Sequence, residues 1–87
     1  MNQKEQRKAQ AAADFEEVAA MAEANGVILI QRSLIHYQLR DVNSTWLINL
    51  YPTTGRVVVD KQHPVVPVFE PPEDWTLALV AGMAVNI

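Results

Sequence analysis

The chain has 87 residues, of which 49% are hydrophobic and 20% are charged, and its formal net charge is −3. This length suits one small domain, and this hydrophobic content suits a packed core, which excludes a disordered tail. Because the chain has no cysteine, disulfides, thiolate catalysis and cysteine-ligated zinc are also excluded. The first residues are polar and the longest apolar run, Trp75 to Val85, is too short to span a bilayer. We therefore expect a cytoplasmic protein with no membrane contact.

Residues 5–24 have the periodicity of an amphipathic helix. Its apolar stripe follows 4-3-4 spacing and consists of Ala11, Phe15, Val18 and Ala22. The pair Asn25-Gly26 is a good helix stop because both residues tolerate a left-handed backbone. We expect residues 1–8 to be a flexible N-terminal segment and residues 9–87 to form a single α+β domain.

After the helix, apolar and polar residues alternate in three runs, which is the period of a β-strand. The apolar members of these runs are Ile35, Tyr37, Leu39, Trp46, Ile48, Leu50, Val57 and Val59. Two turn clusters, residues 41–44 and 52–55, separate the runs. If each is a four-residue hairpin loop, Leu39 lies opposite Trp46, and Leu50 lies opposite Val57. Both loops then place the same residues on one core face, which predicts a three-stranded antiparallel meander.

Two segments fit this scheme less simply. Residues 27–31 either begin a long first strand that bends near Ser33, or form a separate short strand or a buried connector. Residues 62–72 contain four prolines and should run extended along the core without pairing in a central strand.

A last helix is expected from Trp75 to Ala84, with Glu73 and Asp74 in its first turn, where acidic groups suit the helix dipole. The predicted fold is therefore α+β, in the order helix, three strands, helix. Both helices are expected on the apolar face of the sheet.

No catalytic or metal-binding constellation emerges from the sequence. His36 and His63 are the only imidazoles, and Ser33 points to the opposite strand face from His36. Asp60 and His63 are fewer ligands than zinc needs. The PxxP spacing of Pro64 and Pro67 is weak and common. We expect a protein that is not an enzyme and that uses no cofactor and no metal.

The polar face of the meander is the candidate binding site. A tyrosine, two arginines, a histidine and two amides on an open sheet could hold a phosphate backbone or an acidic peptide. These residues are His36, Gln38, Arg40, Asn49, Tyr51 and Arg56. The assumed loops place His36, Asn49 and Val58 in one row. The simpler interpretation is an ordinary solvated face, since antiparallel sheets commonly leave one side in water.

Two hypotheses about function follow. The first is a non-catalytic protein-interaction module that binds a protein partner, in particular a second copy of itself, through its apolar carboxyl end or its sheet edges. The alternative is a weak nucleic-acid-binding regulator that uses the basic face of the sheet. It is favoured by the charge distribution, because residues 27–63 carry four basic side chains against two acidic ones.

Overall fold

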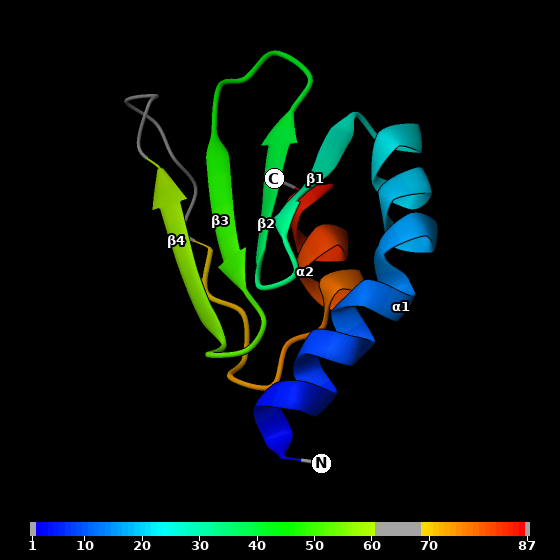
Figure 1. Cartoon of the computed structure of the whole chain (residues 1–87). Helices are drawn as coiled ribbons and strands as arrows, with labels where there is room; N and C mark the ends of the chain where they lie inside the picture. Colours follow the sequence, from blue (N-terminus) through cyan, green and yellow to red (C-terminus); the bar gives the residue numbers. More distant parts are fainter. Residues whose placement is uncertain (1, 61–68, 87) are drawn as a thin grey trace.

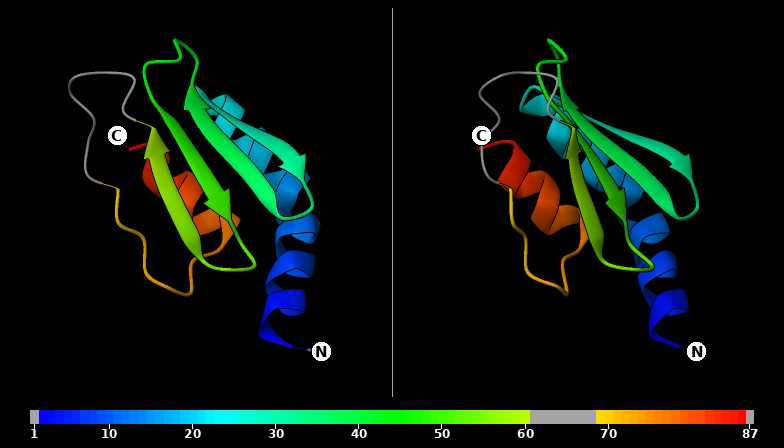
Figure 2. Two further views of the ribbon diagram at one scale, coloured as in Figure 1. Left: turned by 60° about the vertical axis from the view of Figure 1, so that its left-hand side comes forward. Right: turned by 90° about the vertical axis from the view of Figure 1, so that its left-hand side faces the viewer.

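The structure is a computed structural model, and it describes residues 2–60 and 69–86. The helices and strands of these ranges are α1 (Gln3–Ala24), β1 (Val27–Ser33), β2 (His36–Asp41), β3 (Leu47–Tyr51), β4 (Arg56–Asp60) and α2 (Leu77–Ala84). The strands form one antiparallel sheet in the order β1-β2-β3-β4. Both helices lie behind the same face of this sheet (Figures 1 and 2). The α+β class is therefore confirmed, but the sheet has four strands where three were predicted.

Helix α1 begins at its cap residue Asn2, whose Oδ1 accepts a hydrogen bond from the Glu5 N–H at 2.9 Å. Its predicted apolar stripe is buried or half-buried against the core. The helix ends at Ala24, and Gly26 then takes a φ of +79°, which a residue with a Cβ adopts only at a cost. The helix thus starts two residues before the expected position, and the flexibility of residues 1–8 stays a prediction.

Residues 27–31, whose conformation the sequence left open, belong to β1, which is the strand that the predicted meander lacked. It pairs antiparallel with β2, and Leu29 lies opposite Leu39. The chain turns sharply at residues 34–35, where the Ser33 hydroxyl accepts a hydrogen bond from the Ile35 N–H at 3.2 Å. Ile35 was predicted on the core face, but it lies in this turn and is 50% exposed.

The predicted register of the first hairpin is wrong by two residues. Leu39 lies opposite Ile48 and not opposite Trp46, because the loop between the paired strands holds six residues. Asp41 organises this loop, since its carboxylate accepts hydrogen bonds from the Thr45 N–H at 2.6 Å and the Thr45 hydroxyl at 2.5 Å. Burial alone would raise the pKa of Asp41, but these hydrogen bonds outweigh it and hold the pKa below its usual value.

The second hairpin has the predicted register. Tyr51 lies opposite Arg56, Leu50 opposite Val57, and Ile48 opposite Val59. The further predicted pair, Trp46 with Lys61, and the PxxP segment lie outside the described residues. Since an error of two residues leaves side chains on their original face, the predicted partition into core and polar faces is retained in β2, β3 and β4.

The core lies between the sheet and the two helices. Its largest fully buried side chains are Tyr37, Leu39, Ile48, Leu50, Leu77 and Val80. Burial raises the pKa of Tyr37, whose hydroxyl accepts a hydrogen bond from Gln31. Helix α2 starts at Leu77, two residues later than expected, because the Thr76 side chain caps it by accepting from the Leu79 N–H. Glu73 and Asp74 therefore precede the helix and are not in its first turn.

Candidate functional site

The sheet face opposite the helices, here called the open face, carries the predicted site in three cross-strand rows. The strand pairings give these rows as Ile28, Arg40, Leu47 and Asp60; then Ile30, Gln38, Asn49 and Val58; then His36, Tyr51 and Arg56. The predicted row of His36, Asn49 and Val58 is wrong, because the two-residue shift of β3 moves His36 beside Tyr51. All six predicted site residues nevertheless lie on this one face.

A chain of side-chain hydrogen bonds crosses the open face. The Arg32 Nε–H donates to the Gln38 Oε1 at 2.7 Å, and the Gln38 amide donates in turn to the Asn49 Oδ1 at 2.9 Å. The His36 Nε2 lies 2.9 Å from the same Asn49 oxygen. Because that oxygen only accepts, Nε2 must carry the proton, and the neutral ring has its unprotonated nitrogen at Nδ1. Arg32 is thereby oriented by two amides.

His36 also stacks on Tyr51. Their ring centroids are 4.7 Å apart and their planes differ by 10°. Strands β2 and β3 place the two rings side by side, because His36 and Tyr51 are adjacent in sequence to the paired residues Tyr37 and Leu50. Four of the six predicted residues are therefore in mutual contact: His36, Gln38, Asn49 and Tyr51.

The two predicted arginines stand at opposite ends of this contact group. Arg40 donates to the Ser44 hydroxyl at 3.1 Å, beside the β2–β3 loop. Arg56 is exposed and pairs across the strands with Tyr51. Arg32 was not among the predicted site residues, because it lies just after the segment whose conformation the sequence left open. A shallow groove of about 190 Å³ runs between Arg32 and Arg40, past Ile30 and Leu47.

The open face combines basic groups with apolar ones. Its charged side chains on the strands are Arg32, Arg40, Arg56 and Asp60, so the face is basic although the whole chain is acidic. Ile28, Ile30 and Leu47 are half-buried there, and Val58 is exposed. Such a surface suits a partner that offers both acidic and apolar groups.

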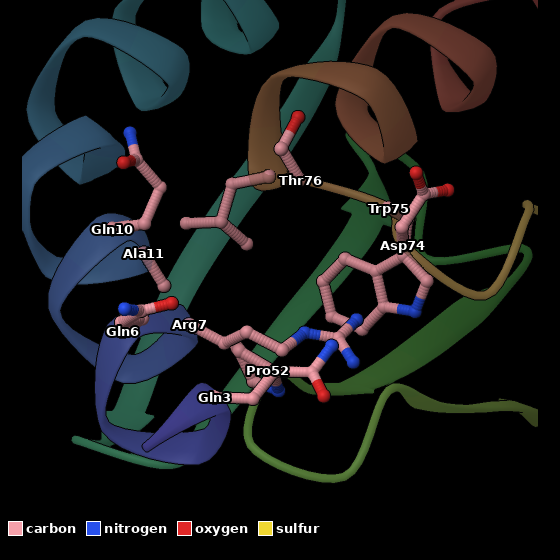
Figure 3. Close-up of a pocket in the computed structure, with 10 residues that line it drawn as sticks. Gln3, Gln6, Arg7, Gln10, Ala11, Pro52, Asp74, Trp75 and Thr76 are labelled. Atoms are coloured by element: carbon pink, nitrogen blue, oxygen red, sulfur yellow. The ribbon is translucent and has the colours of Figure 1, made fainter. Parts of the chain in front are cut away.

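A second feature that the sequence did not indicate lies where α1 begins. There a cavity of about 200 Å³ is lined by Gln3, Gln6, Arg7, Gln10, Ala11, Pro52, Asp74, Trp75, Thr76 and Leu77 (Figure 3). The Arg7 guanidinium lies 5.7 Å from the centre of the Trp75 ring and donates to the Glu73 carbonyl oxygen at 2.8 Å. The Trp75 indole N–H donates to the Gly55 carbonyl oxygen at 2.9 Å. Because Arg7 and Trp75 both donate to backbone carbonyl groups of the same chain, their hydrogen bonds connect α1, the turn at Gly55 and the segment before α2.

The described residues also bear on metal binding and membrane insertion. Within residues 2–60 and 69–86, no group of three or more histidine and carboxylate side chains is arranged to hold a metal ion. No helix in those ranges is long and apolar enough to cross a membrane. The predicted absence of catalysis remains a prediction.

Comparison with known protein families, with curated proteins and with solved structures gave no match to this chain.

Proposed function

We propose that this chain is a non-catalytic protein-interaction module that associates with a second copy of itself. The observation that supports this most is the position of β1, which is an edge strand that pairs only with β2 within the described residues. An edge strand offers a row of unpaired backbone groups to another chain. Its residues Val27–Ile30 are all apolar, whereas edges that avoid pairing usually carry lysine or proline.

The apolar carboxyl end gives less support than the edge strand. In α2, Val80, Ala81 and Ala84 are buried in the core of the same chain, and Val85 packs against that core. The helix thus covers the core of its own domain. Leu79 is the large apolar side chain of α2 that is exposed, at 43%. Self-association through the sheet edge explains more of the exposed apolar surface.

Sedimentation equilibrium of the pure chain, from low to high micromolar concentration, tests this proposal. We expect a monomer–dimer equilibrium that changes little between low and physiological salt, because apolar contacts and backbone hydrogen bonds are weakly screened. A strict monomer over the whole range would refute self-association.

The second candidate function, weak nucleic-acid binding, is favoured by one specific observation. The open face combines Arg32, Arg40 and Arg56 with the stacked pair His36 and Tyr51. Proteins that bind single-stranded nucleic acid usually combine positive charge with aromatic side chains on which bases stack.

Fluorescence anisotropy with single- and double-stranded oligonucleotides at rising salt tests the second candidate. Each single variant, Arg40→Ala or Arg56→Ala, should weaken binding and reduce the slope of log affinity against log salt by about one, and the double variant should abolish binding. The matched control is Lys4→Ala/Lys8→Ala, which removes the same charge from α1. Equal loss in both variants, or no binding at low salt, would exclude the open face as a nucleic-acid interface.

A further inference from the structure

The first part of β1 is apolar on both sides of the sheet over Val27–Ile30 and ends at an irregularity after Gln31. Val27 and Leu29 are buried in the core, while Ile28 and Ile30 are half-buried on the open face. The pairing with β2 then shifts between Gln31 and Ser33. This leaves five consecutive uncharged residues in regular geometry at the edge, and α1 lies behind them and not beside them (Figure 2).

The direction of the backbone groups in this strand follows from one hydrogen bond. The Val42 N–H donates to the Gly26 carbonyl oxygen at 3.2 Å, in the same register as the β1–β2 ladder. Since backbone groups alternate between the two sides of a strand, Ile28 and Ile30 bond toward β2. The N–H and C=O groups of Val27, Leu29 and Gln31 therefore point outward.

We infer that β1 pairs antiparallel with β1 of a second copy, about a two-fold axis at Leu29. This inference rests on the proposed self-association and names its interface. An isologous contact between two identical edge strands is necessarily antiparallel. With Leu29 opposite Leu29 of the second copy, each Ile28 lies opposite Ile30 of the second copy. The three outward-pointing residues then pair with one another, and four isoleucines form one apolar cluster on the combined open face.

Exposed apolar side chains at the two ends of β1 fit this arrangement. Among the described residues, Leu34, Ile35 and Val42 are three of the five large hydrophobic side chains that are exposed, at 58%, 50% and 58%. Leu34 and Ile35 form the hairpin tip after β1, and Val42 is bonded to Gly26 before it. Antiparallel pairing brings the Leu34–Ile35 tip of each copy toward the Gly26 end of β1 in the other, so apolar side chains of both copies come near the interface.

Charge does not oppose the same register. Arg32 of one copy lies beyond the paired segment, near Gly26 of the second copy, and its side chain stays on the open face, where it donates to Gln38. The two Arg32 side chains meanwhile stay at opposite ends of the shared ladder.

The flank of α1 away from α2 carries small side chains. Asp14, Val18 and Met21 lie on the α2 side of the helix, where they line a hollow with Ala78. By the helical period, Ala12 and Ala19 lie on the other flank, toward the outer side of β1. Two small residues seven positions apart allow two neighbouring α1 helices to approach closely.

Cysteine cross-linking tests the interface, because the natural chain has no cysteine. Chains with Ile28→Cys and chains with Ile30→Cys are mixed, with oxidised glutathione as the oxidant. Directly opposed residues in such a pair meet the Cα spacing of a disulfide, whereas 28 with 28 or 30 with 30 are diagonal and too far apart. We expect the mixture to cross-link at least about tenfold faster than either variant alone. The control mixture is Ile30→Cys with Val58→Cys, which places one thiol on β4.

The outcomes separate the interface from the function. Preferential cross-linking of the mixed pair, with a natural chain that dimerises in sedimentation, supports the inference. A dimer whose mixed pair reacts no faster than the control would overturn this interface and leave the proposed function standing. Faster cross-linking of Ile30→Cys alone would refute the axis at Leu29, and a natural chain that stays monomeric would refute the proposed function itself.

Discussion

The turn at Gly55 offers a quantitative test of how the three segments around Arg7 are held together. Gly55 has a φ of +72°, and a Cβ placed on it would lie 3.0 Å from Arg7 Nη1 and 3.3 Å from the Glu73 carbonyl oxygen. Gly26 has a similar φ of +79°, but a Cβ there meets nothing within 4 Å. Gly26→Ala is therefore a matched control that carries the backbone strain without the contact.

The left-handed conformation should cost each alanine variant about 1 kcal/mol of unfolding free energy. Gly55→Ala must in addition displace Arg7 from the Glu73 oxygen and from the Trp75 ring. A surface hydrogen bond and a cation–π contact together are worth about 1–2 kcal/mol, so the expected total is about 2–3 kcal/mol. Urea unfolding followed by circular dichroism measures both losses, and at a slope of about 1 kcal/mol per molar each kilocalorie moves the midpoint by about 1 M.

Repeating both substitutions in an Arg7→Ala background completes the test. With the guanidinium removed, the excess cost of Gly55→Ala over Gly26→Ala should largely vanish, apart from the slightly tight contact with Glu73. If the two glycine variants cost the same with Arg7 present, or if the excess persists without it, the assigned role of Arg7 is wrong.

Three further outcomes are expected from the same unfolding assay. Asp41→Asn should cost about 1 kcal/mol near neutral pH through its lost hydrogen bonds. Because the pKa of Asp41 is lowered from 3.8 by folding, this contribution is complete above pH 3.8 and disappears as the pH falls through the folded value, where variant and natural chain should converge. Thr76→Ala should cost about 1 kcal/mol through the lost cap of α2, while Thr76→Ser should retain most of it. Leu50→Ala, at a fully buried position, should cost about 2–5 kcal/mol, against less than about 0.5 kcal/mol for Val58→Ala on the open face.

Much of the fold could be predicted from periodicity, and the parts that could not have identifiable causes. The stripe from Ala11 to Ala22 and the alternation in residues 46–59 gave α1 and the second hairpin correctly. A separate strand at residues 27–31 was one of several alternatives left open, because Val27–Ile30 is a continuous apolar run in which neither period can be seen. The side chains of Val27 and Leu29 face the core. Ile28 lies on the open face, in the same row as Arg40 and Leu47.

Loop length was the other obstacle. The cluster at residues 41–44 suggested a four-residue turn, but the Asp41 carboxylate reaches the Thr45 N–H and closes a longer loop. Such a side-chain contact is not visible in composition. The contact of Arg7 with Glu73 was missed because it depends on where two distant segments meet in space. The cap at Thr76 is local, and a threonine just before an apolar run was a signal that the sequence did carry.

The prediction of the candidate site depended little on the register, although three strands contribute residues to it. An error of two residues changes which side chains are directly opposed, yet it leaves them on the same face. His36 and Asn49 were predicted as direct neighbours, and they are diagonal, but their long side chains still meet at 2.9 Å. The same period applies to the dimer, because an axis at Ile30 would also place the isoleucines on the open face. That axis would set Ile28 opposite Arg32 of the second copy, whereas the axis at Leu29 sets Ile28 opposite Ile30 and so pairs apolar side chains with one another. Fast cross-linking of Ile28→Cys with Ile30→Cys is therefore expected from the axis at Leu29 alone.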